Sequence, residues 1–324
     1  MIRQFVVALS AAVVTYAVQP AAVAQVPDRL DWTIEAAGPN DPGKVQFSIG
    51  YRRARGSSQW SNTTDLSELA GLTAAQLAGD AVPVRFQLVR EAGRFDCEGV
   101  ARRGRGTDDC GFTPDPAFAA ALARNNIGAP DREQSYGLAL ARVSIAMVEE
   151  LRRQGYRTPG PGDLVGAGIH RVDAAYIRDM AAAGYRLGTV DGLVQMRIHR
   201  VTPDYISALA AAGYRPSAEM AVRLRIHGAT PEYIRALGAA GASGFDTDDL
   251  VALRIHGVSP EFVGELRGLG YERLTAENLT AMRIHGVTGA FVRRANEEAG
   301  RRLSPEELVS ERLMPRRTRV GNRS

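Results

Sequence analysis

Apolar side chains in the second half of the chain recur at helical spacing within short segments. In residues 203–211, for example, Tyr205, Ile206 and Leu209 fall on one face of a helix. A polar residue precedes such a segment and a glycine follows it, as Thr202 and Gly213 do here. This order of cap, amphipathic segment and glycine predicts a short helix with one buried face.

These predicted helices belong to a repeat. The string "RLRIHGATPEYI" at residues 223–234 returns as "MRIHRVTPDYI" before it and as "LRIHGVSPEFV" and "MRIHGVT" after it. The histidines of the chain all occupy this place, separated by 29, 28, 29 and 29 residues: His170, His199, His227, His256 and His285. A fixed period of this length is typical of stacked supersecondary units.

Each unit contains two predicted helices. The first begins after a capping residue, namely Ser144, Asp173, Thr202, Thr230, Ser259 or Thr288, and ends near Gly155, Gly184, Gly213, Gly241 or Gly270. The second follows caps such as Thr189, Ser217, Thr275 and Ser304. The same register extends back to residues 113–141, where Asn126 replaces the glycine and Ala141 replaces the histidine. Residues 113–314 are therefore predicted to form seven helical hairpins, stacked as an α-solenoid.

A different pattern precedes the repeats. Apolar and polar residues alternate in "RLDWTIEAAG", "KVQFSIGYRR", "VPVRFQLVREAG" and "RFDCEGVARRG", which indicates strands. The stretch between them, "DLSELAGLTAAQLAG", is predicted to form one short helix opened by a Ser or Thr cap. The fold class is thus α+β: a small antiparallel β domain over residues 25–112, followed by about seven helical-hairpin repeats of 28–29 residues.

The two cysteines lie in the last predicted hairpin. If the chain reverses at Arg103 and Gly104, Cys97 and Cys110 stand directly opposite each other, so a disulfide across the hairpin is predicted. A nucleophilic cysteine would need a nearby histidine base, but every histidine lies in the repeats.

The two ends of the chain have compositions of their own. Residues 1–24 contain a basic Arg3, an apolar run and a small-residue site at Ala22-Val23-Ala24, which is the layout of a signal peptide cleaved after Ala24. We therefore expect a periplasmic or secreted protein with no stable membrane insertion after cleavage. Residues 315–324 are predicted to be a basic disordered tail.

The repeat histidines fit a structural role. Each lies at the end of a predicted second helix, where an imidazole can meet unpaired carbonyls and the negative end of the helix dipole. One histidine per hairpin cannot converge on a metal ion, because packed helices are about 8–10 Å apart and zinc ligands lie within about 2.1 Å. The chain also lacks HExxH, GxSxG and phosphate-binding glycine motifs, so we expect no cofactor, no metal and no enzymatic activity.

Arginine precedes four of these histidines by two positions: Arg197, Arg225, Arg254 and Arg283. Two interpretations remain open. The row could bind an acidic partner or an anionic polymer, or it could be a solvated edge that neutralises helix ends. The net charge of +4 is mild, and every basic residue except Lys44 is arginine, so a nucleic-acid partner is not implied. A basic helical array can also bind RNA, but the export signal argues against it.

The repeat sequences carry a resemblance. "LRIHGVSPEFVGELRGLGY" and "MRIHGVT" resemble the tail repeats attached to bacterial BlaR-type membrane metallopeptidases. "VRFQLVREAGRFDCEGVARRGRG" with "FTPDPAFAAAL" is similar to the β segment that precedes such repeats. The chain lacks the membrane helices and the zinc motif of that family, so the resemblance implies a sensing or interaction module without peptidase activity.

These observations together predict an exported, non-enzymatic protein that binds an envelope protein partner through its repeats, because stacked hairpins form extended binding surfaces. Two alternatives stay open. One is a binder of cell-wall or other anionic envelope polymers that uses the arginine row. The other is a hydrolase with an unrecognised site.

Overall fold

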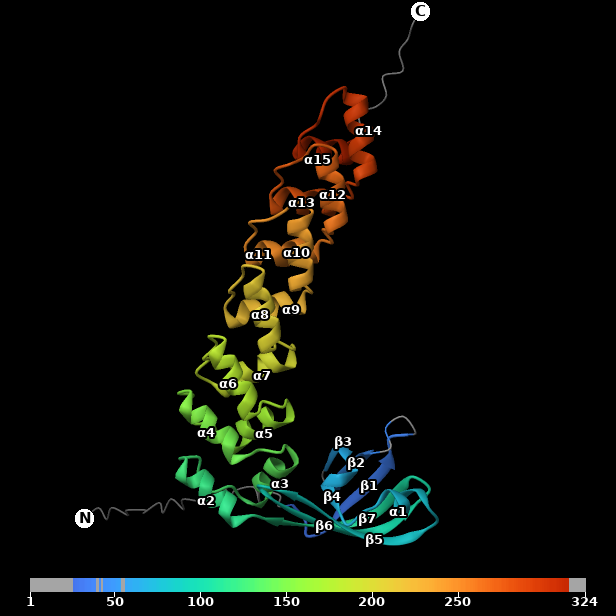
Figure 1. The fold of residues 1–324 in the computed structure, drawn as a ribbon, viewed down its shortest axis with the longest axis vertical. Helices are drawn as coiled ribbons and strands as arrows, with labels where there is room; N and C mark the ends of the chain where they lie inside the picture. The colour runs from blue at the N-terminus through green and yellow to red at the C-terminus, as the bar shows by residue number, and fades with distance from the viewer. Residues whose placement is uncertain (1–25, 39–40, 42, 54–55, 315–324) are drawn as a thin grey trace, which may run out of the picture.

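The computed structural model describes residues 26–38, 41, 43–53 and 56–314, which form a β domain and a stacked array of helices (Figure 1). The predicted α+β class is confirmed, and so is the helical repeat array. The predicted signal peptide and basic tail lie outside the described residues. Within these ranges, no helix is both long enough and apolar enough to cross a membrane.

The β domain is one curled antiparallel sheet. Its strands are β1 (Leu30–Ala36), β2 (Lys44–Arg53), β3 (Gly56–Asp65), β4 (Leu69–Ala70), β5 (Val82–Arg90), β6 (Gly93–Arg102) and β7 (Arg105–Pro114), in the order β3-β2-β1-β7-β6-β5-β4. The rings of Phe47 in β2 and Phe86 in β5 have centroids 6.2 Å apart. Four strand spacings of a flat sheet would separate them by roughly 19 Å. The sheet therefore curls around the apolar side chains of one face, which form the core.

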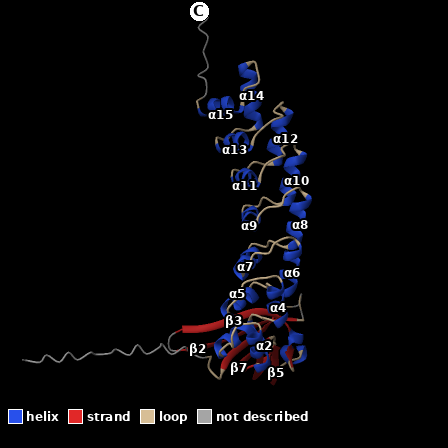
Figure 2. Ribbon diagram, turned by 90° about the vertical axis from the view of Figure 1, so that its left-hand side faces the viewer, coloured by secondary structure: helices blue, strands red, loops and turns tan. Residues whose placement is uncertain are grey.

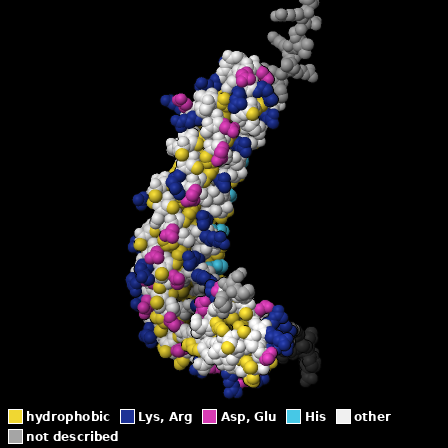
Figure 3. Space-filling model, turned by 45° about the vertical axis from the view of Figure 1, so that its right-hand side comes forward, with side chains coloured by type: hydrophobic (Ala, Val, Ile, Leu, Met, Phe, Trp, Pro, Cys, Tyr) yellow, Lys and Arg dark blue, Asp and Glu magenta, His cyan; other side chains and the backbone are white. Residues whose placement is uncertain are grey.

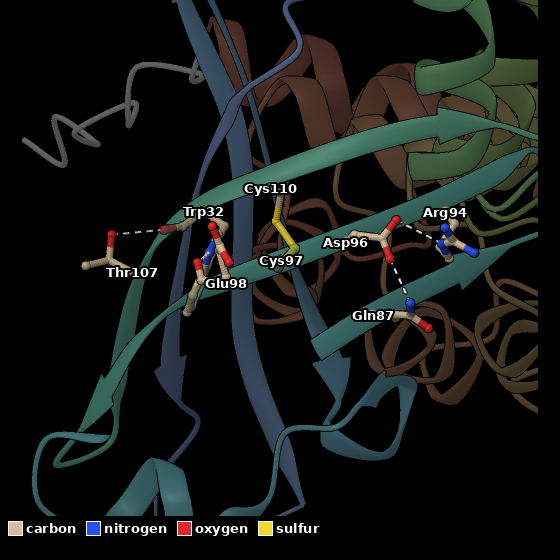
Figure 4. Close-up of a disulfide and its surroundings, with 8 residues drawn as sticks. All are labelled: Trp32, Gln87, Arg94, Asp96, Cys97, Glu98, Thr107 and Cys110. Atoms are coloured by element: carbon tan, nitrogen blue, oxygen red, sulfur yellow. Dashed lines mark hydrogen bonds and ion pairs between the residues drawn. A yellow bond between two sulfur atoms is a disulfide. The ribbon is translucent and has the colours of Figure 1, made fainter. Parts of the chain in front are cut away.

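The hairpin of β6 and β7 carries the predicted disulfide. Cys97 and Cys110 are opposite each other in the register and are bonded, with a Cα–Cα distance of 4.1 Å (Figure 4). The chain reverses at Arg103 and Gly104, which both have positive φ. Beside the disulfide, the Trp32 indole donates a hydrogen bond to the Glu98 carbonyl at 2.9 Å, so β1 is also tied to this hairpin.

Two segments of the β domain differ from expectation. Residues 65–79 do not form one helix: they contain a 3-10 turn at Leu66–Glu68, strand β4 and the short helix α1 (Ala74–Ala78), which Thr73 caps. The chain leaves the helical path because Leu69 and Ala70 pair with β5, and Gly71 then turns with a φ of 105°. The second difference is β3, a strand of mostly polar residues that the apolar alternation did not reveal.

The helices form two parallel rows, each stacked on its own neighbours (Figure 2). The first row contains α2 (Pro116–Arg124), α4 (Ile145–Arg153), α6 (Ala174–Ala182), α8 (Pro203–Ala211), α10 (Pro231–Ala239), α12 (Pro260–Gly268) and α14 (Gly289–Ala299). The second row contains α3 (Arg132–Leu140), α5 (Pro161–Ile169), α7 (Val190–Ile198), α9 (Ala218–Ile226), α11 (Thr247–Ile255), α13 (Ala276–Ile284) and α15 (Pro305–Leu313).

Local capping explains why the helices begin where the sequence predicted. Asp115, Ser144, Asp173, Thr202, Thr230, Ser259 and Thr288 each accept a backbone N–H of the first-row helix that follows. The predicted glycines after these helices have φ between 77° and 95°, and Asn126 takes their place in the first unit with a φ of 61°. Each predicted hairpin is thus delimited by side chains within its own unit.

The array is joined to the sheet without a linker. Strand β7 ends at Pro114, and Asp115 already caps α2. Tyr136 of α3 packs against Phe95 and Phe112 of the sheet, with ring centroids 5.9 and 5.6 Å away. The apolar core therefore continues from the sheet into the first hairpin. This packing holds the two parts of the molecule at the angle seen in Figure 1.

Candidate binding site

The repeated Ile-His pair lies at the C-terminal end of each second-row helix from α5 to α13. In these helices the isoleucine is the last helical residue and the histidine is the C-cap, followed by a residue with positive φ. The histidine side chains are exposed or half-exposed, and none of the five imidazoles forms a hydrogen bond or an ion pair with another described residue. The predicted position is therefore found, but the proposed capping hydrogen bond of the imidazole is not seen.

The isoleucines beside them form a row of exposed apolar side chains, the Ile row. Their exposed fractions are 46% for Ile169, 44% for Ile198, 54% for Ile226, 56% for Ile255 and 55% for Ile284. The neighbouring histidines lie along the border of the array that rises above the β domain (Figure 3). Sequence reasoning missed this row, although the sequence contains a signal for it. The isoleucine directly precedes the histidine, whereas the core residue, such as Leu253, lies three residues before the histidine. The isoleucine therefore falls outside the helical period of the core positions.

The four arginines of the candidate row are used within the fold. Each guanidinium lies over the aromatic ring of its own unit, with 4.6, 4.8, 4.9 and 5.2 Å from the guanidinium carbon to the ring centroids: Arg197 on Tyr176, Arg225 on Tyr205, Arg254 on Tyr233 and Arg283 on Phe262. In three of them Nε also donates to a backbone carbonyl of the turn that ends the previous unit, at 3.0–3.1 Å: Arg197 to Arg171, Arg254 to Gly228 and Arg283 to Gly257. The arginines thus connect consecutive units.

The stacked tyrosines contact the turn that follows their unit, whereas the arginines contact the turn that precedes it. Tyr176 and Tyr233 donate their hydroxyl protons to the carbonyls of Val201 and Val258, in the turns that end their own units. Burial raises the pKa of Tyr176, Tyr205 and Tyr233 to about 12, although the arginine above each ring opposes the shift. The turn at residues 256–258 is therefore held from both sides, by Tyr233 of the unit before it and by Arg283 of the unit after it.

The unit 200–227 is an exception. The hydroxyl of Tyr205 is buried without a hydrogen-bond partner, and among the described residues no hydrogen bond of the Arg225 guanidinium is found. This unit is one residue shorter than its neighbours, in the connection between α8 and α9. It keeps the stacked pair but lacks both hydrogen bonds of the pattern.

The arginine position is a glycine in the unit that ends at His170. A Cβ on Gly168 would come within 2.3 Å of the Ala141 carbonyl oxygen, so no side chain fits there. The first turns of the array therefore pack backbone against backbone, and the arginine pattern begins one unit later.

A cavity of about 500 Å³ lies in the corner between the sheet and the array. Strand β3 contributes Trp60 and Asn62 to its lining, and the array contributes Leu140, Ile169 and Arg171. Glu68 and Arg142 also line it, and Glu68 pairs with Arg90 at 2.5 Å and with Arg142 at 3.0 Å. Burial would raise the pKa of the Glu68 carboxyl, but the two guanidinium groups outweigh it and hold the pKa below its ordinary value. The cavity thus has an apolar part, an ion-pair cluster around Glu68, and the charged side chains of Asp65, Arg171 and Asp173, for which no ion pair is found among the described residues.

In the described part of the chain, no three His, Cys, Asp or Glu side chains lie close enough together to hold a metal ion. The residues predicted as functional fall into two places. Cys97 and Cys110 lie in the β domain, whereas the histidines and arginines lie along one border of the array. The structure brings the histidines together with the Ile row and not with the cysteines.

Comparison of the chain with known proteins found no match. No protein-family model matches the chain, and no curated protein or solved structure matches it either. The resemblance to the repeats of BlaR-type proteins therefore stays a prediction.

Proposed function

We propose that this is an exported, non-enzymatic protein whose helical array binds an envelope protein partner along the Ile row. The observation that carries the proposal is the row itself: five large apolar side chains, each 44–56% exposed, at equivalent positions of consecutive units. Single exposed apolar residues are ordinary on protein surfaces, but a contiguous set is typical of an interaction site. Solenoids use such extended surfaces to bind other proteins.

The arginine contacts favour a protein partner over an anionic polymer. In three of the four guanidinium groups, Nε donates a hydrogen bond to a backbone carbonyl and one face of the group stacks on an aromatic ring. This leaves fewer donors for a polyanion than a free row would offer. The disulfide supports export, because such bonds persist mainly in oxidising compartments.

The proposal is tested by capture from a detergent extract of the bacterial envelope, with the full chain immobilised. The test variant replaces Ile198, Ile226 and Ile255 with serine. The matched control replaces Ala182, Ala211 and Ala239 with serine, which are exposed residues at the ends of first-row helices. We expect one partner, identified by mass spectrometry, to be retained by the wild type and the control and retained at least about tenfold less by the isoleucine variant.

Melting curves of the wild type and the control should coincide, and the isoleucine variant should stay folded with a slightly lower melting temperature, because about half of each isoleucine side chain is exposed. Capture of no protein by the wild type, or equal capture by the isoleucine variant, would contradict the proposal.

A further inference from the structure

Strand β3 is an edge of the sheet with an open side. It has ten residues, pairs only with β2, and is the first strand in the sheet order. Among the described residues, no backbone hydrogen bond reaches residues 57–65 from any other element. Alternate N–H and C=O groups of this strand therefore face outward, as in any antiparallel edge strand.

The usual protections of an edge are missing from β3. Natural proteins shorten edge strands or place lysine or proline on them. The opposite edge follows this rule, because β4 has only two residues. The sequence of β3, "GSSQWSNTTD", has no proline, no lysine and one charged residue, at its end. Such an edge is suited to pair with another extended chain.

The open edge faces the corner cavity and the beginning of the Ile row. Trp60, Asn62 and Thr63 of β3 line the cavity together with Ile169, the first isoleucine of the row. Trp60, Leu140 and Ile169 form an apolar part of the lining. Of the charged residues, Arg142 is paired with Glu68 and Lys44 with Asp41, while Asp65, Arg171 and Asp173 also line the cavity. The apolar part of the cavity, beside the edge strand, can therefore take an apolar side chain.

We propose that β3 pairs with an extended segment of the partner protein, which becomes an eighth strand and places an apolar side chain in the corner cavity. The inference rests on the proposed function, since it specifies how a protein partner would bind. An extended polypeptide is the occupant that the edge requires, because only a peptide backbone offers N–H and C=O groups at the spacing of a strand, about 3.3 Å per residue. From the cavity the segment continues toward the Ile row.

The test uses peptides of about ten residues, the length of β3, selected from a random library on the immobilised full chain. The best binder is synthesised, and hydrogen exchange of the full chain is measured with and without it. We expect slower exchange of the backbone amides of β3 and of residues beside the cavity. A copy of the peptide that is N-methylated at alternate residues should bind at least about tenfold more weakly, because it cannot complete the strand pairing.

Two proline variants locate the contact on the protein. Ser58→Pro and Gln59→Pro differ in whether the lost N–H faces β2 or the open edge, since neighbouring residues of a strand alternate. We expect one variant to melt at a lower temperature and the other to keep its melting temperature but bind the peptide at least about tenfold more weakly.

The outcomes separate this inference from the proposed function. Peptides that slow exchange only along α7, α9 and α11 would overturn the β3 site and leave the Ile row as the binding surface. Failure to select any binding peptide would also overturn the inference. A dimer of the free chain with β3 already protected would do the same, because the occupant would then be a second copy. Loss of capture by the isoleucine variant tests the proposed function independently of all three.

Discussion

Equivalent residues of the repeat do not carry equal interactions. Tyr176 and Tyr233 donate hydrogen bonds of 2.8 and 2.7 Å to valine carbonyls, whereas the buried hydroxyl of Tyr205 has no partner. In unit 257–285 the same position is a phenylalanine, Phe262, and Arg283 stacks on its ring. The ring is thus kept in the four units from residue 171 to residue 285, while the hydroxyl is useful only where a carbonyl lies within reach.

This difference gives a matched pair of substitutions. Tyr233→Phe should lower the free energy of unfolding by about 1 kcal/mol, because it removes a buried hydrogen bond and leaves the Val258 carbonyl without its donor. Tyr205→Phe should leave the free energy of unfolding unchanged or raise it, because it removes a hydroxyl that has no partner. Chemical denaturation of both variants measures the two effects. Equal destabilisation would show that the hydroxyl of Tyr205 finds an acceptor in solution.

Residue-level prediction from sequence worked where the interaction is local. Caps such as Ser144 and Thr230 bond to backbone groups three residues away, so their role follows from neighbouring letters. The bond from Tyr233 to Val258 spans 25 residues, and the arginine bonds span 26. No local rule states which side chain will meet a turn at that separation, and for this reason the arginine contacts were not foreseen.

At the scale of the element, the ends of α7, α11 and α13 each combine one connecting side chain with one exposed side chain. In α11, Arg254 stacks on Tyr233 and donates to the Gly228 carbonyl, while the imidazole of His256, two residues later, makes no hydrogen bond to another described residue. Position in the helix alone does not separate these roles. The contacts assign the connection between units to the arginine.

Replacement of each residue by alanine should therefore give unequal effects. Arg254→Ala should lower the free energy of unfolding by about 1–2 kcal/mol, because it removes a charge-assisted hydrogen bond and the stacking contact. His256→Ala should change it by less than about 0.5 kcal/mol, as expected for an exposed side chain without a hydrogen bond. Thermal and urea unfolding of the two variants are the measurements. The reverse order would restore the histidine as the structural cap.

Elements with an apolar pattern were predictable from sequence, and polar ones were not. The helices and the alternating strands follow from periodicity. Strand β3 alternates between exposed and partly buried side chains, but serine, threonine and glutamine occupy most positions, so no apolar period marks it. Residues 65–79 failed for another reason: pairing of Leu69 and Ala70 with β5 overrides a local helical pattern.

The whole molecule is a linear stack on a fixed base. Each first-row helix packs on the next first-row helix and each second-row helix on the next second-row helix. The period predicted this arrangement, because equal units can only bury their apolar faces by stacking. The angle to the sheet and the corner cavity depend on contacts such as Tyr136 with Phe95, which join residues that are far apart in the sequence.

Removal of one complete unit tests the linear stack. Deletion of residues 228–256 joins His227 to Gly257, so a histidine-glycine turn is kept and the two remaining neighbours can stack. We expect helical circular dichroism in proportion to the remaining helices, cooperative unfolding, and a shorter particle in small-angle scattering.

The control deletion removes only residues 243–256, which contain α11 and leave α10 without its second-row partner. This chain should lose cooperative unfolding. If both deletions behave alike, the hairpin is not the unit of assembly.

The shortened unit 200–227 also affects how the array responds to load. It retains the stacking of Arg225 on Tyr205, but it has neither the arginine bond to a turn carbonyl that Arg197 makes nor the tyrosine bond that Tyr233 makes in the neighbouring units. Bending strain in a rod concentrates where the connections are weakest, so the array would flex first at α8 and α9. Two stiffer arms on either side would then swing about this joint, and the Ile row could adjust its curvature to a partner without the loss of a hydrogen bond.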